Sequence, residues 1–210
     1  MNNDLFITLM RHVRSLADDE QVHEGRYDSP LTDVGRKQYL QRASEWQIEK
    51  KQFDLIISST MQRARSSAQI IADALNVPLI HDPDWMEMDN GPLAGMTFDL
   101  AAKQFPRPVF RSPYEAFCGS GESAWQIYCR VARAMEALIR RGPGAYLVIA
   151  HGMIINEALR TICGAGPSVN DQGAWFVLGD AAFVRLQYRP EKYQWRFLEF
   201  NPGFFPEDGE

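Results

Sequence analysis

The sequence, 210 residues long, lacks the features that mark several classes of protein. It has three cysteines, at positions 118, 129 and 163, which form neither a CxxC pair nor a disulfide framework. This argues against a disulfide-stapled scaffold and predicts reduced cysteines that pack inside a cytoplasmic protein. No apolar run approaches the roughly 18–20 residues of a membrane helix. The opening MNNDLFITLM has no basic region and only a short apolar run, so we expect no signal peptide.

Positive charge is not in excess either. The chain has 22 Lys and Arg against 27 Asp and Glu, which gives a net charge of −5. This balance argues against a general nucleic-acid surface but leaves room for a locally basic pocket. The histidines show no HxH, HxxxH or HExxH spacing, so we expect neither a metal site nor a metal cofactor. From the net charge and the lack of long apolar runs, we expect neither nucleic acid nor membrane as a partner.

The composition and patterning that remain are those of a globular domain. Hydrophobic residues make up 45% of the chain and charged residues 23%, with no internal repeat, linker or low-complexity segment. We therefore treat residues 1–210 as a single domain. Apolar segments suited to buried strands lie at residues 5–10, 53–58, 77–81 and 145–150. Three more strands are expected within residues 174–200, beginning with 174–180.

Helical patterns separate the strands. Thr32 is placed to cap a first helix, and Ser59 and Thr60 to cap a second that runs to Leu75. The apolar face of the first helix is expected from Tyr39, Leu40, Ala43 and Trp46. Further helices are expected at 121–141 and 153–163. Because strands alternate with helices, the pattern predicts a mostly parallel, doubly wound α/β sheet covered on both faces.

Two segments fit neither pattern. Residues 13–30 are polar and without periodicity, and they predict a long loop. Residues 82–120 are irregular and rich in Pro, Gly and aromatic residues, with a short helix expected near 97–105. A loop region of this length inside a domain is usually functional, so we expect 82–120 to be an insertion that faces the substrate.

Cationic and titratable side chains stand where buried strands end. Arg11 and His12 follow the first apolar strand, and His151 follows the strand at 145–150. In a parallel α/β sheet, ligands bind outside the carboxyl ends of the strands, where these residues should meet. Arg63 lies in the first turn of a helix, whose free N–H groups favour anions. Together these groups suit a phosphate dianion.

Six segments in order carry a resemblance to a known family. They are residues 6–12, 28–35 (DSPLTDVG), 58–68 (SSTMQRARSSA), 87–95 (EMDNGPLAG), 121–123 (GES) and 150–152 (AHG). In this order they resemble the histidine phosphatase superfamily, the phosphoglycerate-mutase-like proteins. The resemblance covers roughly residues 5–163. It implies a three-layer α/β/α sandwich and a phosphohistidine intermediate.

The resemblance also implies roles for individual residues. His12 resembles the nucleophile, which attacks phosphorus as a neutral imidazole, and Arg11 and Arg63 resemble the phosphate clamp. His151 resembles the second pocket histidine, and Glu87 stands where the phosphatases of the family have their proton donor. Phosphoryl transfer depends mostly on positioning and electrostatic stabilisation, which such residues supply without a metal.

Further candidates and some departures complete the motif. Gly152 is assigned to the phosphate site, and Ser15, Asp18 and Ser123 are further candidates, Ser123 either for the phosphate or for a helix cap. Asp18 stands where the family commonly has an Asn, and Val13 where it has Gly or Ala. Valine there must point into the core or narrow the pocket. The usual second Glu of the 87–95 motif is absent.

Three functions remain open. The first is a metal-independent phosphatase that hydrolyses a phosphomonoester through a phosphohistidine. The second is a phosphoglycerate mutase, which needs a longer and more basic insertion than 96–120, where only Lys103, Arg107 and Arg111 are basic. The third is a catalytically weak phospho-ligand-binding protein, suggested by Val13 and Asp18. We expect a small phosphorylated substrate as the partner and leave a homodimer open; the phosphatase is the preferred interpretation.

Overall fold

A six-stranded sheet runs through the centre of the molecule. The computed structural model describes residues 3–167 and 169–205. The strands are β1 (Leu5–Arg11), β2 (Leu55–Ser58), β3 (Leu79–His81), β4 (Gly144–Ala150), β5 (Phe183–Arg189) and β6 (Gln194–Asn201). Their order in the sheet is β3-β2-β4-β1-β5-β6. The first four strands of this order are parallel, whereas β5 is antiparallel to β1 and β6 is antiparallel to β5.

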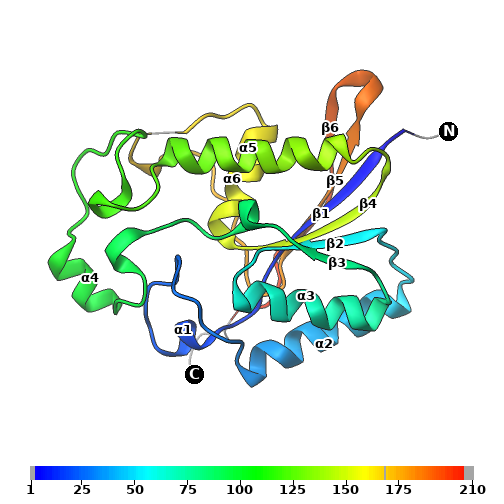
Figure 1. The fold of residues 1–210 in the computed structure, drawn as a ribbon, viewed down its shortest axis with the longest axis horizontal. Coiled ribbons are helices and arrows are strands. Elements are labelled where there is room, and N and C mark those ends of the chain that lie inside the picture. The colour runs from blue at the N-terminus through cyan, green and yellow to red at the C-terminus, as the bar shows by residue number, and fades with distance from the viewer. Residues whose placement is uncertain (1–2, 168, 206–210) are drawn as a thin grey trace.

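Helices cover both faces of this sheet (Figure 1). The helices of the described residues are α1 (Leu16–Asp19), α2 (Asp33–Ile48), α3 (Gln62–Leu75), α4 (Phe98–Gln104), α5 (Ala124–Arg140) and α6 (Gly152–Ile162). Helices α2 and α3 lie on one face, and α5 and α6 lie on the other. The predicted three-layer α/β/α sandwich with a mostly parallel sheet is therefore confirmed.

The core consists of two apolar layers, one on each face of the sheet. Along β1, Ile7 and Leu9 pack towards α5 and α6, whereas Met10 packs towards α2 and α3. This alternation is the period-two geometry of a strand buried on both sides. The two layers hold β1 and β4 in the middle of the sheet, so that their carboxyl ends are fixed in position.

The start of α2 is where the sequence predicted it. Thr32 is the N-cap, and its hydroxyl accepts a hydrogen bond of 3.0 Å from the backbone N–H of Gly35. Tyr39, Ala43 and Trp46 are buried as expected. The inclusion of Leu40 in the apolar face is wrong, since this residue is 58% exposed. Adjacent helical positions differ by about 100°, so that burial of Tyr39 turns the next side chain away.

Other predictions require correction. Residues 174–180 do not form a strand; the side-chain amide of Asn156 instead accepts from the N–H of Phe176 and donates to its carbonyl. The loop 13–30 contains the short helix α1. Met61, not Ser59 or Thr60, is the N-cap of α3. Cys129 and Cys163 are free but exposed, so they are not packing residues.

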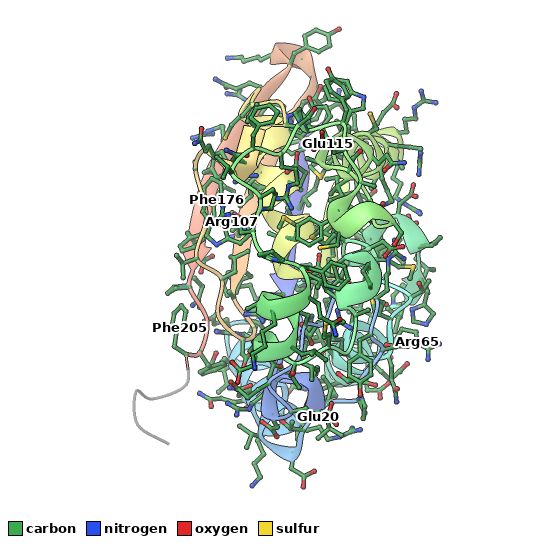
Figure 2. The ribbon with its side chains drawn as sticks, turned by 90° about the vertical axis from the view of Figure 1, so that its left-hand side faces the viewer. Glu20, Arg65, Arg107, Glu115, Phe176 and Phe205 are labelled. Carbon is green, nitrogen blue, oxygen red and sulfur yellow. The ribbon has the colours of Figure 1, made fainter. Side chains whose placement is uncertain are left out.

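The irregular segment 82–120 carries α4 and three single-turn 3₁₀ helices, of which Pro83–Trp85 is the first. The short helix expected near 97–105 is therefore confirmed. The segment extends beyond the sheet on the side towards which β1 runs from the N-terminus (Figure 1). Seen from that side, it crosses the face of the molecule, with Arg107 and Glu115 labelled on it (Figure 2). No helix of the described residues is long and apolar enough to cross a membrane.

Val13 belongs to the core layer beneath α2. Its side chain is fully buried and packs with residues such as Met10 and Tyr39. A Cβ atom added at Gly35 would lie 3.1 Å from Val13 Cγ2, which shows how closely α2 approaches this side chain. Of the two alternatives for valine at this position, the structure shows the one that points into the core.

We predict that Val13→Ala lowers the free energy of unfolding by about 1–3 kcal/mol, because it removes two buried methyl groups and leaves a cavity. The matched control is Val34→Ala, since Val34 is 55% exposed on α2; there we expect a change within about 0.5 kcal/mol. Urea unfolding of both variants measures the difference. Equal effects at the two positions would show that Val13 does not support the core.

Candidate active site

Pairing of β1 with β4 brings the two pocket histidines together. In the parallel register Arg11 lies opposite Ala150, and the backbone N–H of His12 donates to the carbonyl of Ala150 at 3.0 Å. The ring centroids of His12 and His151 are consequently 5.0 Å apart. Both side chains are buried, at 1% and 0% exposure. The prediction that these residues meet at the carboxyl edge of the sheet is confirmed.

The hydrogen bonds of His12 determine which ring nitrogen carries the proton. Nδ1 lies 2.8 Å from the carbonyl oxygen of Val13, and since a carbonyl only accepts, Nδ1 is the donor. Nε2 accepts from Arg63 Nε at 3.1 Å and therefore carries the lone pair. Burial, followed by the charges of Arg63 and Arg11, lowers the pKa of His12 well below 6.5. The imidazole is thus neutral at pH 7, as a nucleophile must be.

Arg63 enters the site from the first turn of α3 and is fully buried. Its Nη1 donates to the carbonyl of Tyr27 at 2.9 Å and its Nη2 to the carbonyl of Gly25 at 3.0 Å. These bonds orient the guanidinium so that its Nε–H points at His12. Arg63 is therefore anchored by the loop before α2 and presents its Nε edge to the site.

Arg11 supplies a second cation at the end of β1. Its Nη1 donates to the carbonyl of Leu178 at 2.7 Å, and its own carbonyl accepts from the hydroxyl of Tyr39 at 2.9 Å. A Cβ atom at Gly152 would lie 3.8 Å from Arg11 Nε, so the first residue of α6 lies beside this guanidinium. The free N–H groups at the start of α6 add partial positive charge there.

His151 is the N-cap of α6 and is held by Ser59. His151 Nε2 lies 2.8 Å from Ser59 Oγ, which also accepts from the backbone N–H of Met61. When the hydroxyl hydrogen of Ser59 points at Nε2, the ring proton is on Nδ1. Within the described residues Nδ1 is buried without a partner. Burial and the charge of Arg63 lower the pKa of His151, so its imidazole is neutral at pH 7.

Glu87 reaches the same site from the segment 82–120. One carboxylate oxygen accepts from the N–H of Met88 at 2.8 Å, and the other accepts from the N–H of Met153 at 3.4 Å. Burial raises the pKa of Glu87, although Arg63 acts in the opposite direction. A carboxyl group with a raised pKa is suited to give up a proton and take one back near neutral pH.

Three hollows with shared lining residues lie beside this site. The first, of about 220 Å³, is lined by Arg11, Gly152, Glu87 and Glu24, among others. The second, of about 200 Å³, shares Glu24, Glu87 and Met153 with the first. The third, of about 760 Å³, shares His23, Leu93 and Phe117 with the second. Residues of the segment 82–120 therefore line open space next to the hollow at Arg11.

The remaining candidates lie at helix starts. Ser15 and Asp18 form the capping box of α1, where the Asp18 carboxylate accepts from the backbone N–H of Ser15 at 2.7 Å. Asp18 is therefore held by α1. Ser123 caps α5, and its hydroxyl accepts from the N–H of Gln126 at 3.2 Å. The cap is thus the role that the structure gives to Ser123.

Sequence reasoning missed Glu24, which lies inside the site. Its Oε1 accepts from the hydroxyl of Ser15 at 2.7 Å, and its Oε2 lies 3.7 Å from His12 Nε2. The only sequence signal was its place before Gly25, whose φ of +49° marks a tight turn in the loop 13–30. Within residues 3–167 and 169–205, no group of three or more His, Cys, Asp or Glu side chains is arranged to hold a metal ion.

Comparisons with known proteins find relatives in sequence and a solved structure of the same fold. The Bacillus subtilis (strain 168) protein named "Uncharacterized phosphatase PhoE" is 24% identical over 196 residues, which are 93% of each chain. The Yersinia pestis (strain Pestoides F) protein named "Probable phosphoglycerate mutase GpmB" is 28% identical over 164 residues, which are 76% of this chain and 75% of that one. The solved structure of "Mycobacterial hydrolase 1" has a TM-score of 0.81 at 20% identity and covers 96% of this chain and 100% of its own.

A family model matches most of the chain. The model of the histidine phosphatase superfamily (branch 1) aligns with residues 7–201, a range that contains both histidines, both arginines and Glu87. The observed fold and the meeting of these side chains at one sheet edge agree with this match. The chain therefore belongs to branch 1 of the histidine phosphatase superfamily.

Proposed function

We propose that the protein is a phosphomonoesterase that works through a phosphohistidine on His12 and needs no metal ion. The observation that carries the proposal is the neutral, buried imidazole whose Nε2 lone pair faces Arg63 beside Arg11. The superfamily and the relatives named as phosphatase and mutase support phosphoryl transfer in general. The finer assignment rests on the residues of this site.

In the first half-reaction, His12 Nε2 attacks phosphorus and the bond from phosphorus to the ester oxygen breaks. Arg63 Nε–H turns from Nε2 to a phosphoryl oxygen, which frees the lone pair for attack. Arg11, the start of α6 and His151 Nδ1–H stabilise the charge on the other oxygens. Glu87, whose pKa burial raises, gives its proton in its protonated form to the departing alkoxide.

In the second half-reaction, water replaces the alcohol on the side of Glu87. The Glu87 carboxylate takes a proton from this water as its oxygen attacks phosphorus, and the phosphorus–Nε2 bond breaks. Phosphate leaves, His12 is again neutral and Glu87 is again protonated. The reaction therefore balances with water as the only co-reactant, and the arginines supply the positive charge that a metal would otherwise provide.

The shape of the hollows supports an ester with a bulky, largely apolar alcohol. The large hollow is lined by Phe98, Phe105 and Phe117, with Arg107 and Arg111 at its wall. Arg107 also donates to the carbonyl of Asn170. A mutase, which must hold a second phosphate, is the alternative that the name of GpmB suggests; dependence of turnover on a bisphosphoglycerate would identify it.

We predict that a phosphate monoester transfers its phosphoryl group to His12. Rapid quenching of the reaction should trap an acid-labile, alkali-stable phosphoryl group on the peptide that contains His12, because a phosphoramidate has this stability. His12→Ala should carry no label. Label on a serine or an aspartate would refute the mechanism.

Glu87→Gln should slow the hydrolysis of an alkyl phosphate by roughly 10²–10⁴-fold, since a poor leaving group needs a proton in the transition state. p-Nitrophenyl phosphate should lose much less, because nitrophenolate leaves without a proton. In the wild type, kcat/KM for the alkyl ester should fall as the pH rises through the raised pKa of Glu87, and the variant should lack this limb. Equal losses on both esters would show that Glu87 is not the acid.

Hydrolysis should survive prolonged treatment with EDTA, because Arg11 and Arg63 provide the fixed positive charge. We expect the initial rate on p-nitrophenyl phosphate to stay within twofold of the untreated protein. Loss of activity that a divalent ion restores would contradict the proposal of metal independence.

A further inference from the structure

Glu24 occupies the place that a transferred phosphoryl group must reach. Its Oε1 lies 3.3 Å from Arg63 Nε, and its Oε2 lies 3.7 Å from His12 Nε2. The hydroxyl of Ser15 donates to Oε1 at 2.7 Å and holds the carboxylate there. A phosphoryl group under attack by Nε2 needs the same two neighbours, the nucleophile and the guanidinium edge.

The carboxylate also separates the nucleophile from open space. The linings of the two hollows nearest the site include Glu24 and Glu87, whereas His12 and Arg63 line neither hollow. The Glu24 side chain is 17% exposed, and those of His12 and Arg63 are 1% and 0% exposed. An incoming phosphoryl group therefore meets Glu24 first and must displace its carboxylate to reach Nε2.

The carboxylate of Glu24 lowers the net positive charge of the site. Arg11 and Arg63 are the cations that converge here, and both histidines are neutral. The Glu24 carboxylate is an anion in direct contact with Arg63. Burial is the main cause of the raised pKa of Glu87, and the charge of Glu24 raises it further. Glu24 therefore offsets one of the two positive charges of Arg11 and Arg63, which suits a ligand of one negative charge better than a ligand of two.

We propose that Glu24 is a specificity-determining residue that makes the site prefer tetrahedral anions of one negative charge over those of two. The substrate class is then a phosphoryl group with a single charge, either a diester or a monoester that keeps one proton. The proposal rests on the proposed function only in taking the pocket at His12 as the phosphoryl site.

The test compares two anions whose charges do not change near neutral pH. Sulfate carries two negative charges and methanesulfonate one, and both are tetrahedral. Titration calorimetry at pH 7 gives the dissociation constant of each for the wild type and for Glu24→Gln. This variant removes the charge but keeps an oxygen that can accept from Ser15. The matched control is Glu20→Gln, which removes a charge from an exposed position near the same loop, where Glu20 accepts from Tyr27.

We expect Glu24→Gln to bind sulfate roughly 10- to 100-fold more tightly than the wild type, the effect of a like charge within about 4–6 Å. The gain in affinity for methanesulfonate should be several-fold smaller. Glu20→Gln should leave both dissociation constants within about twofold of the wild type. If the dissociation constants of both anions fell by the same factor, Glu24 would only block the pocket, and the charge preference would be overturned. Unchanged dissociation constants would also overturn it. Glu24→Ala provides the same comparison if the Gln variant does not fold.

These binding measurements separate the inference from the proposed function. Anion affinities that shift as expected in a protein that hydrolyses no ester would support the role of Glu24 and refute the phosphatase. Hydrolysis of an ester by a protein whose anion preference does not change in Glu24→Gln would support the phosphatase and refute the role of Glu24. Turnover of p-nitrophenyl phosphate against its methyl diester then distinguishes the two sources of a singly charged phosphoryl group.

Discussion

Parallel pairing of β1 with β4 is the constraint on which the rest of the site depends. Its register, with Leu5 opposite Gly144 and Arg11 opposite Ala150, aligns the carboxyl ends of two strands that are distant in sequence. Two histidines that are 151 − 12 = 139 positions apart thereby become neighbours. Because each face of β1 packs against its own layer of helices, a slip of one residue would turn every side chain towards the wrong layer and His12 out of the pocket. The core therefore holds the catalytic geometry.

The same burial determines the charge states in the pocket. Burial and then the two nearby guanidiniums lower the pKa of both imidazoles, so that His12 Nε2 keeps its lone pair and the positive charge stays on the arginines. Backbone carbonyls orient Arg63, and Ser59 orients His151. The acids that enter this field, Glu87 and Glu24, come from loops, and we assign them different tasks. The scaffold thus supplies the fixed charges and the loops supply the groups that we expect to set rate and selectivity.

Most of the scaffold could be predicted from the sequence, because strand ends and helix caps have local signals. Arg11, His12 and His151 follow apolar strands, and Thr32 precedes a helical pattern, so each was expected where the structure has it. Glu24 was not found, since it lies in a loop without periodicity, and its position depends on contacts with Ser15 and distant residues. Tertiary contacts are also the reason why the backbone of Phe176 pairs with the side chain of Asn156 and not with a strand.

The central claim is that phosphoryl transfer passes through His12 in two displacement steps. The most direct measurement is the stereochemistry of hydrolysis of a phosphate monoester made chiral at phosphorus with isotopes of oxygen. Each in-line displacement inverts the configuration, so that attack by His12 followed by attack by water predicts overall retention. Inversion would show that water attacks the ester in a single step, and it would contradict the role of His12 as the nucleophile.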